Sequence, residues 1–393
     1  MSENLQIKKE HYFDWAATSP CDEEILKESV EITLKNWGNP SSTHNVGKKA
    51  RSVFEEARKR CANAMGVKTE NIYFTSGGTE SDQIALLSVL EKPAKGKVLI
   101  SALEHPAIRE QANQLKKCGW NVGVIPSDKN GFITPQAVKS ALSDDTYLVC
   151  VMAVNNETGA IQPIYEIADV IKEFGKGKRK PKFHVDCVQA AGKIPLNLSY
   201  DGIDSAAFSA HKICGPRGIG ILYSKENIES FLRGGGQEKN VRSGTENVLG
   251  AVAFSKCLEK YFLKTNSTDF VNENALKISK EFVQKLSELK NCTIVPPYRL
   301  EKPELYSPFV VQAAFENIPG NVMLRALDSK GFYISTGSAC STKKASRPIL
   351  EAMNVPSDIR ETAVRFSYGS ETSEKSIFEL LDAVKEVNST FNK

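Results

Sequence analysis

The stretch that decides the expected fold is SAAFSAHKICGPRG, residues 205–218. It opens with a short apolar strand, Ser205–Phe208, and it ends in a Gly-Pro turn, so Lys212 is expected just beyond a strand end. In a parallel sheet, the carboxyl ends of the strands are where ligands bind. A lysine amine at such a place can form a Schiff base with a carbonyl cofactor, although a lysine considered alone can also be an ordinary surface residue.

On both sides of this stretch, strand-like runs alternate with helical patterns. The apolar residues from Val46 to Met65 recur mostly at three- and four-residue steps, which predicts an amphipathic helix. The strand-like runs are Asn71–Thr75, Val98–Ser101, Val122–Ile125, Tyr147–Val154, Phe183–Val185, Ser205–Phe208 and Gly218–Tyr223. Strands that alternate with helices predict an α/β fold whose largely parallel sheet is covered on both faces.

The composition is that of a globular protein with two domains. The chain has 393 residues, 41% hydrophobic and 25% charged, which excludes the disordered and low-complexity classes. A net charge of +4 does not favour nucleic acid or an anionic membrane as the partner, and the basic run at 176–182 is expected to be a solvated loop. Because the sequence pattern changes after about Asn266, we place the domain boundary near residue 263.

Cysteine usage and the N-terminal residues indicate the compartment. The nine cysteines include no C-x-x-C pair, which fits reduced thiols in a cytoplasm better than disulfides or a zinc site. No stretch approaches the ~20 apolar residues of a membrane-spanning helix. Residues 1–10 lack the apolar segment of a secretion signal. We therefore expect a cytoplasmic protein that does not contact a membrane.

Two further segments are expected to share a pocket with Lys212. The segment SGGTES, residues 76–81, follows a strand and opens a helix, where glycines and free backbone amides favour a phosphate. The segment HVDCVQ, residues 184–189, ends another strand, and there Asp186 is either a helix N-cap or the partner of a positively charged ring nitrogen. Such an aspartate and a Schiff-base lysine are together typical of pyridoxal phosphate sites.

A fourth segment carries a candidate nucleophile. The run STGSACSTKK, residues 335–344, is small, polar and basic, which suits an exposed loop. The Cys340 thiol should ionise readily near Lys343 and Lys344, and the thiolate is the reactive form of cysteine. The alternative is a chance cysteine in a flexible segment.

These segments belong to an ordered series of blocks. The series is YFDWAAT (12–18), GNPSSTH (38–44), TSGGTES (75–81), EH (104–105), VNNETG (154–159), HVDCVQ (184–189), SAHKICGPRG (209–218), RSGT (242–245) and RFS (365–367). Over nearly the whole chain, the sequence resembles the cysteine desulfurases of the iron–sulfur-cluster assembly type, in the class V aminotransferase superfamily. The loop TGSAC (336–340) sets this group apart from a related group with Arg-x-Gly-His-His-Cys.

The resemblance implies a cofactor, pyridoxal 5'-phosphate, and a role for individual residues. Lys212 would form the Schiff base, Asp186 would pair with the ring nitrogen, and Gln189 would bond the ring hydroxyl. His105 would stack on the ring and assist proton transfer. The phosphate would be held by Gly78, Thr79, Ser209 and His211, and by Thr245 of the neighbouring subunit, which implies a homodimer.

The resemblance also implies how substrate is bound and converted. Asn156 and Arg365 would hold the carboxylate of L-cysteine, since the planar guanidinium of arginine binds a carboxylate through two parallel hydrogen bonds. Asn156 would also contact the cofactor. Cys340 would take the sulfur as a persulfide, leaving L-alanine. The sulfur would then pass to an acceptor protein of iron–sulfur cluster assembly or of tRNA thiolation. No resident metal is expected. The resemblance allows Cys340 at most a transient role as a ligand of an iron–sulfur cluster.

The implied fold is the pyridoxal-phosphate-dependent transferase fold, which is aspartate aminotransferase-like. Its large domain, residues 16–263, would hold a mixed, mainly parallel seven-stranded sheet. Its smaller α+β domain, residues 1–15 and 264–393, would carry the cysteine loop at about 335–348. Other functions stay open: a selenocysteine lyase or an aminotransferase on the same fold, or a non-catalytic scaffold that relays sulfur.

Three residues depart from the pattern of the family. Trp15 stands where a smaller or more polar residue is usual, and we expect it to reshape the edge of the pocket. Cys187, next to Asp186, and Cys214, two residues after Lys212, stand where other residue types are usual, and these positions would bring both thiols close to the cofactor. We expect both to be packed as small hydrophobic residues, so Cys340 remains the expected sulfur acceptor.

Overall fold

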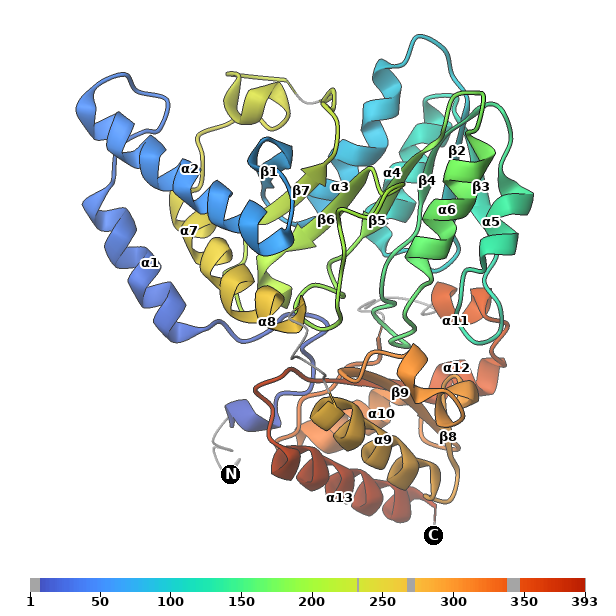
Figure 1. Cartoon of the computed structure of the whole chain (residues 1–393). Coiled ribbons are helices and arrows are strands. Elements are labelled where there is room, and N and C mark those ends of the chain that lie inside the picture. Colours follow the sequence, from blue (N-terminus) through green and yellow to red (C-terminus); the bar gives the residue numbers. More distant parts are fainter. Residues whose placement is uncertain (1–7, 232, 267–272, 338–346, 393) are drawn as a thin grey trace.

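The structure, a computed structural model, contains two sheets that lie in different parts of the molecule (Figure 1). It describes residues 8–231, 233–266, 273–337 and 347–392. The larger sheet and its helices occupy the upper part of the view, and the smaller sheet lies below them. Over these residues, no helix combines the length and the apolar character that crossing a membrane requires.

The larger sheet has seven strands in the order β1-β7-β6-β5-β4-β2-β3. They are β1 Ile72–Thr75, β2 Lys97–Ser101, β3 Asn121–Ile125, β4 Thr146–Cys150, β5 Lys182–Asp186, β6 Ser205–Ser209 and β7 Gly220–Ser224. Strand β7 is antiparallel to both its neighbours, β1 and β6, and the other pairs are parallel. The predicted fold class, with a mixed and mainly parallel sheet of seven strands, is therefore confirmed.

Helices cover both faces of this sheet (Figure 1). They are α1 Glu23–Lys35, α2 Asn45–Met65, α3 Gly78–Leu87, α4 Pro106–Lys117, α5 Pro135–Ala141, α6 Ile164–Phe174, α7 Val248–Cys257 and α8 Leu263–Asn266. The predicted helix from Val46 to Met65 is α2, which His44 caps at its start and which ends at Gly66, in the left-handed conformation that glycine favours. Helix α3 packs against β6 and β7, so its N-terminus lies at the strand ends where the site was expected.

The smaller sheet is antiparallel, in the order β10-β9-β8. Its strands are β8 Cys292–Ile294, β9 Val310–Phe315 and β10 Ala363–Ser367, and its helices are α9 Glu273–Ser287, α10 Gly320–Asp328, α11 Pro348–Ala352, α12 Ser357–Thr362 and α13 Glu374–Phe391. The N-terminal residues join this part of the molecule, since Tyr12 pairs with Tyr333 and Asp14 pairs with Ser367. The domain boundaries given above stay a prediction.

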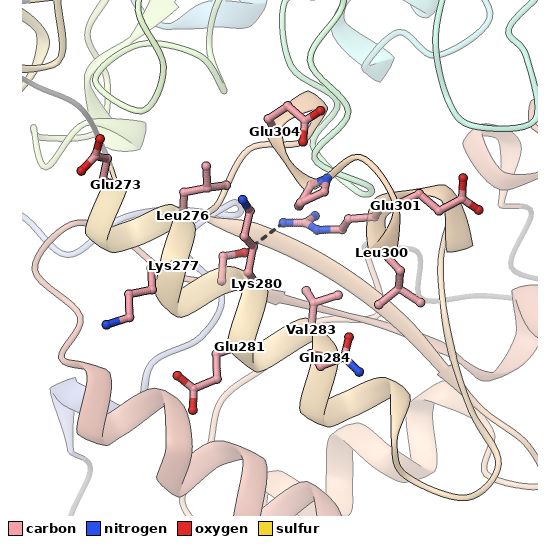
Figure 2. A pocket seen from close by; sticks show the side chains of 13 residues that line it. Glu273, Leu276, Lys277, Lys280, Glu281, Val283, Gln284, Leu300, Glu301 and Glu304 are labelled. Atoms are coloured by element: carbon pink, nitrogen blue, oxygen red, sulfur yellow. Dashed lines mark hydrogen bonds between the residues drawn. The ribbon is translucent and has the colours of Figure 1, made fainter.

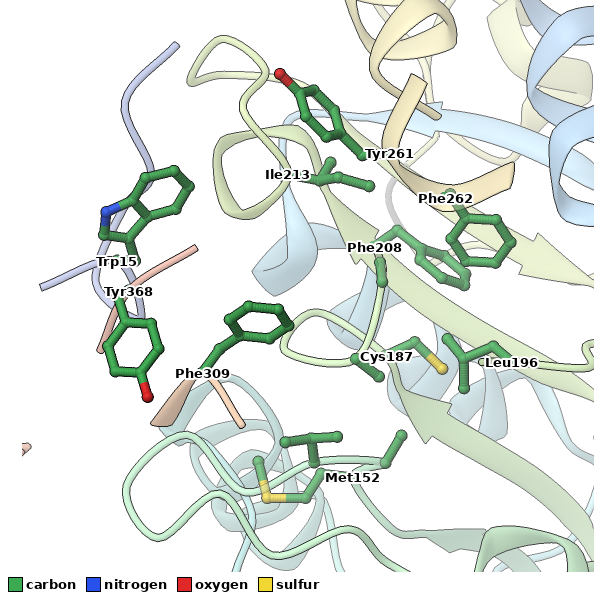
Figure 3. Packing of buried hydrophobic residues seen from close by; sticks show 14 of the residues in the cluster. Trp15, Met152, Cys187, Leu196, Phe208, Ile213, Tyr261, Phe262, Phe309 and Tyr368 are labelled. Atoms are coloured by element: carbon green, nitrogen blue, oxygen red, sulfur yellow. The ribbon is translucent and has the colours of Figure 1, made fainter. Parts of the chain in front are cut away.

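Trp15 and Cys187 are core residues rather than pocket residues (Figure 3). The Trp15 ring covers Gly369, where an added Cβ would lie 2.2 Å from a ring carbon, and only 8% of Trp15 is exposed. Trp15 does not belong to the lining of the cavity described below, although Asp14 and Ala16 on either side of it do. The expectation that Trp15 reshapes the pocket edge is therefore wrong, because its ring turns into the core.

Candidate active site

One cavity of about 660 Å³ lies at the carboxyl ends of β5 and β6. It is closed by the N-terminal segment around Asp14 and by β10. Ten of the predicted site residues line it: Gly78, Thr79, His105, Asn156, Asp186, Gln189, Ser209, His211, Lys212 and Arg365. The fold thus brings together segments that are far apart in the sequence.

Lys212 lies in the short turn that follows β6, and its amine points at the N-terminal segment. Its Nζ donates hydrogen bonds to the carbonyl oxygens of Ala16 and Ala17, both at 2.6 Å. Burial and the nearby charge of Arg365 lower the pKa of Lys212 to about 8. The neutral, nucleophilic form of the amine is therefore far more abundant near neutral pH than it is for an exposed lysine.

Asp186 is the last residue of β5, and its carboxylate is buried in the wall of the cavity. It accepts a hydrogen bond from the backbone N–H of Val188 at 2.9 Å. Burial and the carboxylate of Asp82 raise the pKa of Asp186 to about 8. A cation placed against this carboxylate would oppose that shift and favour its charged form.

The start of α3 forms a site suited to an anion. Gly78 and Thr79 begin the helix, and Ser209 lies beside it, since a Cβ added to Gly78 would lie 3.7 Å from the Cβ of Ser209. His211 lines the same cavity. The backbone comes close here, because a Cβ on Gly220 of β7 would lie 2.6 Å from the backbone of Gly77. Free backbone amides at a helix start and nearby hydroxyl groups can bind a phosphate.

Arg365, on β10, lines the same cavity, and its guanidinium donates to three acceptors, the most distant being the carbonyl oxygen of Gly337 at 3.4 Å. It donates to Oδ1 of Asp14 at 2.7 Å and to the carbonyl oxygen of Asn156 at 2.9 Å. Within the described residues, its Nε and the Oδ1 of Asn156 are buried without a hydrogen-bond partner. The groups around Arg365 can therefore bind a carboxylate with charge-assisted hydrogen bonds.

His105 caps α4, and this contact determines which of its nitrogens is free. Its Nδ1 accepts a hydrogen bond from the backbone N–H of Ala107 at 3.2 Å, so in the neutral ring Nε2 carries the proton. Loss of bulk water around the ring and the charge of Lys212 lower the pKa of His105 to about 4. His105 is thus a neutral ring with an Nε2–H group available in the cavity.

The chain matches the family model described as "Aminotransferase class-V" over residues 11–380. This chain belongs to the class-V aminotransferase family. Among its relatives is a cysteine desulfurase IscS of Dictyoglomus turgidum, 35% identical over 97% of this chain and 95% of that protein. A cysteine desulfurase IscS of Methanosarcina thermophila is also 35% identical, over 98% and 94% of the two chains. The resemblance to the cysteine desulfurases is therefore confirmed.

Solved structures of similar proteins have the same fold. A NifS-like protein superposes with a TM-score of 0.87 at 32% identity, covering 96% of this chain and 99% of that chain. DndA from Streptomyces lividans superposes with a TM-score of 0.73 at 28% identity, covering 91% and 99%. The similarity therefore extends over at least 91% of this chain.

Pyridoxal phosphate, the cofactor of this class-V family, fits the residues of the cavity. The amide-rich start of α3 suits its phosphate, and the amine of Lys212 suits its aldehyde. The buried carboxylate of Asp186, with its raised pKa, suits a protonated ring nitrogen. Among the described residues, no group of three His, Cys, Asp or Glu side chains is suited to a metal ion.

Three residues of the site were not identified from the sequence. Lys193 is buried, and its Nζ donates to Oε1 of Gln189 at 2.7 Å, while Nε2 of Gln189 donates to the carbonyl oxygen of Ala16 at 2.8 Å. Asp14 pairs with Arg365, and Asp82 lines the cavity. Asp14 lies within the block YFDWAAT and Asp82 directly follows the block TSGGTES. Neither position in the sequence indicates which residue the aspartate contacts.

Two predicted residues are not placed in this cavity. Thr245 is exposed and does not line it, which is compatible with a role toward a neighbouring subunit. Cys340 lies outside the described residues, in the segment 338–346. Ser335 and Gly337, which precede that segment, line the cavity wall.

Cys187 and Cys214 are both buried, as expected for packed small residues. Neither lines the cavity. Burial raises the pKa of Cys187 well above its ordinary value and that of Cys214 to about 11. Because the thiolate is the nucleophile, neither thiol suits a sulfur transfer near neutral pH.

A second, more open groove of about 770 Å³ lies between α9 and the turns at Pro297–Leu300 and Pro303–Leu305 (Figure 2). Figure 2 shows lysine and glutamate side chains along it, among them Lys277, Lys280 and Glu281. It contains none of the predicted site residues. We therefore place the candidate site in the cavity around Lys212.

Proposed function

We propose that this protein is a cysteine desulfurase that uses pyridoxal phosphate to remove sulfur from L-cysteine. The observation that carries this proposal is the arrangement of Lys212, Asp186 and Arg365 around one cavity, which provides an amine, a buried carboxylate and a carboxylate-binding arginine. Bound pyridoxal phosphate supplies an electron sink for the carbon atoms of an amino acid.

The residues of this chain would bind and orient the substrate. Arg365 and Asn156 take the carboxylate of L-cysteine, which competes with Asp14 for the arginine fork. Lys212, once its amine is free and neutral, removes the Cα proton and later returns a proton. His105, with a proton on Nε2, can donate a hydrogen bond beside the ring.

Cys340 would take the sulfur. Its thiolate attacks the substrate sulfur, so a sulfur–sulfur bond forms while the bond from sulfur to the substrate carbon breaks. The electron pair of the broken bond stays with the carbon, which is then protonated to give L-alanine. The enzyme is left with a persulfide, which a sulfur-acceptor protein removes.

We extend the proposal to partners and location. A homodimer is supported by the exposed Thr245 and by the apolar Leu34 and Trp37, which are 71% and 75% exposed at the end of α1. Scaffold proteins of iron–sulfur cluster assembly or tRNA-thiolation proteins are the proposed acceptors. A cytoplasmic location is supported by the free thiols of the eight cysteines in the described part of the chain.

Borohydride reduction of the cofactor-loaded protein tests the proposal directly. Reduction followed by peptide mapping should place the adduct on Lys212, and Lys212→Ala should lose it. The control is Lys225→Ala, an exposed lysine outside the cavity, which should retain the adduct. An adduct on another lysine, or none in the wild type, contradicts the proposed site.

The acceptor role of Cys340 has its own test. Cys340→Ala should keep the yellow cofactor and lose the persulfide that forms with L-cysteine, as mass spectrometry can show. Cys187→Ala and Cys214→Ala serve as controls and should keep persulfide formation, because both thiols are buried. If Cys340→Ala still forms the persulfide and one of the controls does not, the acceptor is wrongly assigned.

A further inference from the structure

A buried chain of hydrogen bonds passes through His184, in the middle of β5. Its Nε2 lies 3.0 Å from Oδ1 of Asp82 on α3, and its Nδ1 lies 2.8 Å from Oγ of Ser205 on β6. The strand register explains the second contact, because His184 and Ser205 are direct partners in the β5–β6 pair. His184 and Asp82 are at most 1% exposed, so water does not compete for these bonds.

The two ends of this series of hydrogen bonds, Asp82 and Ser205, line different cavities. Asp82, in the first half of α3, lines the candidate active site. Ser205 lines a second cavity of about 270 Å³ at the opposite end of the strands, together with Tyr147, Arg179 and Ser224. The hydrogen bonds therefore connect the two cavities through α3, β5 and β6.

The chemistry of the three groups allows two arrangements of protons. Burial lowers the pKa of His184 to about 4, so the ring is neutral and carries one N–H group. Either the Ser205 hydroxyl donates to Nδ1 and Nε2–H donates to the Asp82 carboxylate, or a protonated Asp82 donates to Nε2 and Nδ1–H donates to the Ser205 oxygen. Burial raises the pKa of Asp82 well above its ordinary value, so its protonated form is accessible.

We propose that Asp82, His184 and Ser205 form a proton relay between the candidate active site and the second cavity. A proton on Asp82 passes to Nε2, the proton on Nδ1 passes to the Ser205 oxygen, and Ser205 releases its own hydroxyl proton to water. These transfers leave the first of the two arrangements, with Asp82 charged. A proton that Ser205 takes up from water and the same steps in reverse return Asp82 to its protonated form. No oxidant or other reactant is needed.

The relay gives Asp82 a route to water that does not cross the active site. Asp82 is one of three buried carboxylates here: its charge raises the pKa of Asp186, and the charge of Glu104 raises the pKa of Asp82 in turn. When a positively charged group enters the site beside Asp186, Asp82 can lose or gain a proton through the relay even while the cavity is filled. The relay does not depend on the proposed function, since the chain of hydrogen bonds consists of protein groups alone.

Ring-proton exchange of His184 tests the relay. The full-length protein is labelled with ¹⁵N-histidine, and the His184 signal, one of five histidines, is assigned by its loss in His184→Asn. In Ser205→Ala the exchange of the ring N–H with water should slow severalfold, because the hydroxyl that passes the proton to the second cavity is gone. Ser205→Thr keeps a hydroxyl and should restore the exchange.

Ser224→Ala is the matched control. Ser224 lines the same second cavity, but its hydroxyl donates to the carbonyl oxygen of Glu226 and not to His184. Exchange in this variant should equal that of the wild type. The relay is overturned if Ser205→Ala exchanges as fast as the wild type or faster, if Ser224→Ala slows to the same extent, or if the wild-type ring proton exchanges no faster than the core amides of β5.

Discussion

Lys212 differs from an ordinary lysine in the acidity of its amine. Its surroundings lower the pKa from 10.5 to about 8, first through burial and then through the charge of Arg365. Below pH 8 the amine is mostly protonated, and above it the amine is mostly neutral. Because only the neutral amine attacks an aldehyde, this shift controls how the cofactor attaches.

The attachment rate of pyridoxal phosphate to the apoprotein should rise with pH, with a midpoint near 8, and then level off. Stopped-flow absorbance between pH 6 and pH 10 measures it. Arg365→Met should move the midpoint upward, because it removes a positive neighbour of the amine. A rate that is still rising steeply at pH 10 in the wild type would show that the amine titrates like an exposed lysine.

Lys193 acts on the site through Gln189. Lys193→Met keeps most of the length of the side chain but removes the donor to Oε1 of Gln189, so the amide loses the contact that orients it. We expect pyridoxal phosphate to bind about tenfold more weakly, the effect of one lost hydrogen bond. Absorbance titration measures the affinity. An unchanged affinity together with an unchanged unfolding midpoint would mean that Gln189 does not need this partner.

At the scale of elements, one buried ion pair joins α2 to the turn at 236–240. Arg58 donates to both carboxylate oxygens of Glu238, at 2.7 and 2.6 Å, and also to the carbonyl oxygen of Ile72 on β1. Glu238 accepts in addition from the backbone N–H of Phe74. The pair thus fixes α2 and the turn to β1, the strand that leads into the proposed phosphate site at the start of α3.

Arg58→Met should lower the free energy of unfolding by about 3–5 kcal/mol, because the carboxylate of Glu238 stays buried without its partner. Denaturant titration measures the change. The control is Arg60→Met on the same helix, whose partner Glu56 is exposed, and it should cost about 1 kcal/mol or less. Equal losses in the two variants would contradict the importance of the buried pair.

At the scale of the whole molecule, Thr245 distinguishes a site within one chain from a site shared between two. Thr245 is exposed and lies outside the cavity of its own chain. In the proposed homodimer it contacts the phosphate held by the neighbouring subunit. A dimer made from two different variants can therefore contain one intact site even though each chain carries a defect.

Mixing Lys212→Ala chains with Thr245→Val chains should recover cofactor attachment. In a mixed dimer, one site combines Lys212 of the second chain with Thr245 of the first, so about half of the sites in mixed dimers should take up a reducible cofactor. Borohydride fixation counts them, and each variant alone is the control. No recovery, with mixed dimers verified by mass spectrometry, would place the action of Thr245 within its own chain.

Much of the fold and the site could be predicted from local patterns. The helix from Val46 to Met65 and the strand ending before Lys212 depend on periodicity and short-range preference, which neighbouring residues carry. One strand was predicted too long: β4 ends at Cys150 rather than Val154. Residues 151–154 are apolar and buried like those of the strand. An apolar run alone does not distinguish a strand from a buried loop, so the end of β4 could not be predicted.

The sequence by itself determined which residues are the candidates for the chemistry, because its blocks place a lysine, an aspartate and glycines together at strand ends. Only the tertiary structure decided their partners: Asp14 with Arg365, Lys193 with Gln189, and His184 between Asp82 and Ser205. It also turned the Trp15 ring into the core. The physical reason is that these contacts join residues distant in sequence, so packing of whole elements sets their distances, burial and acidity.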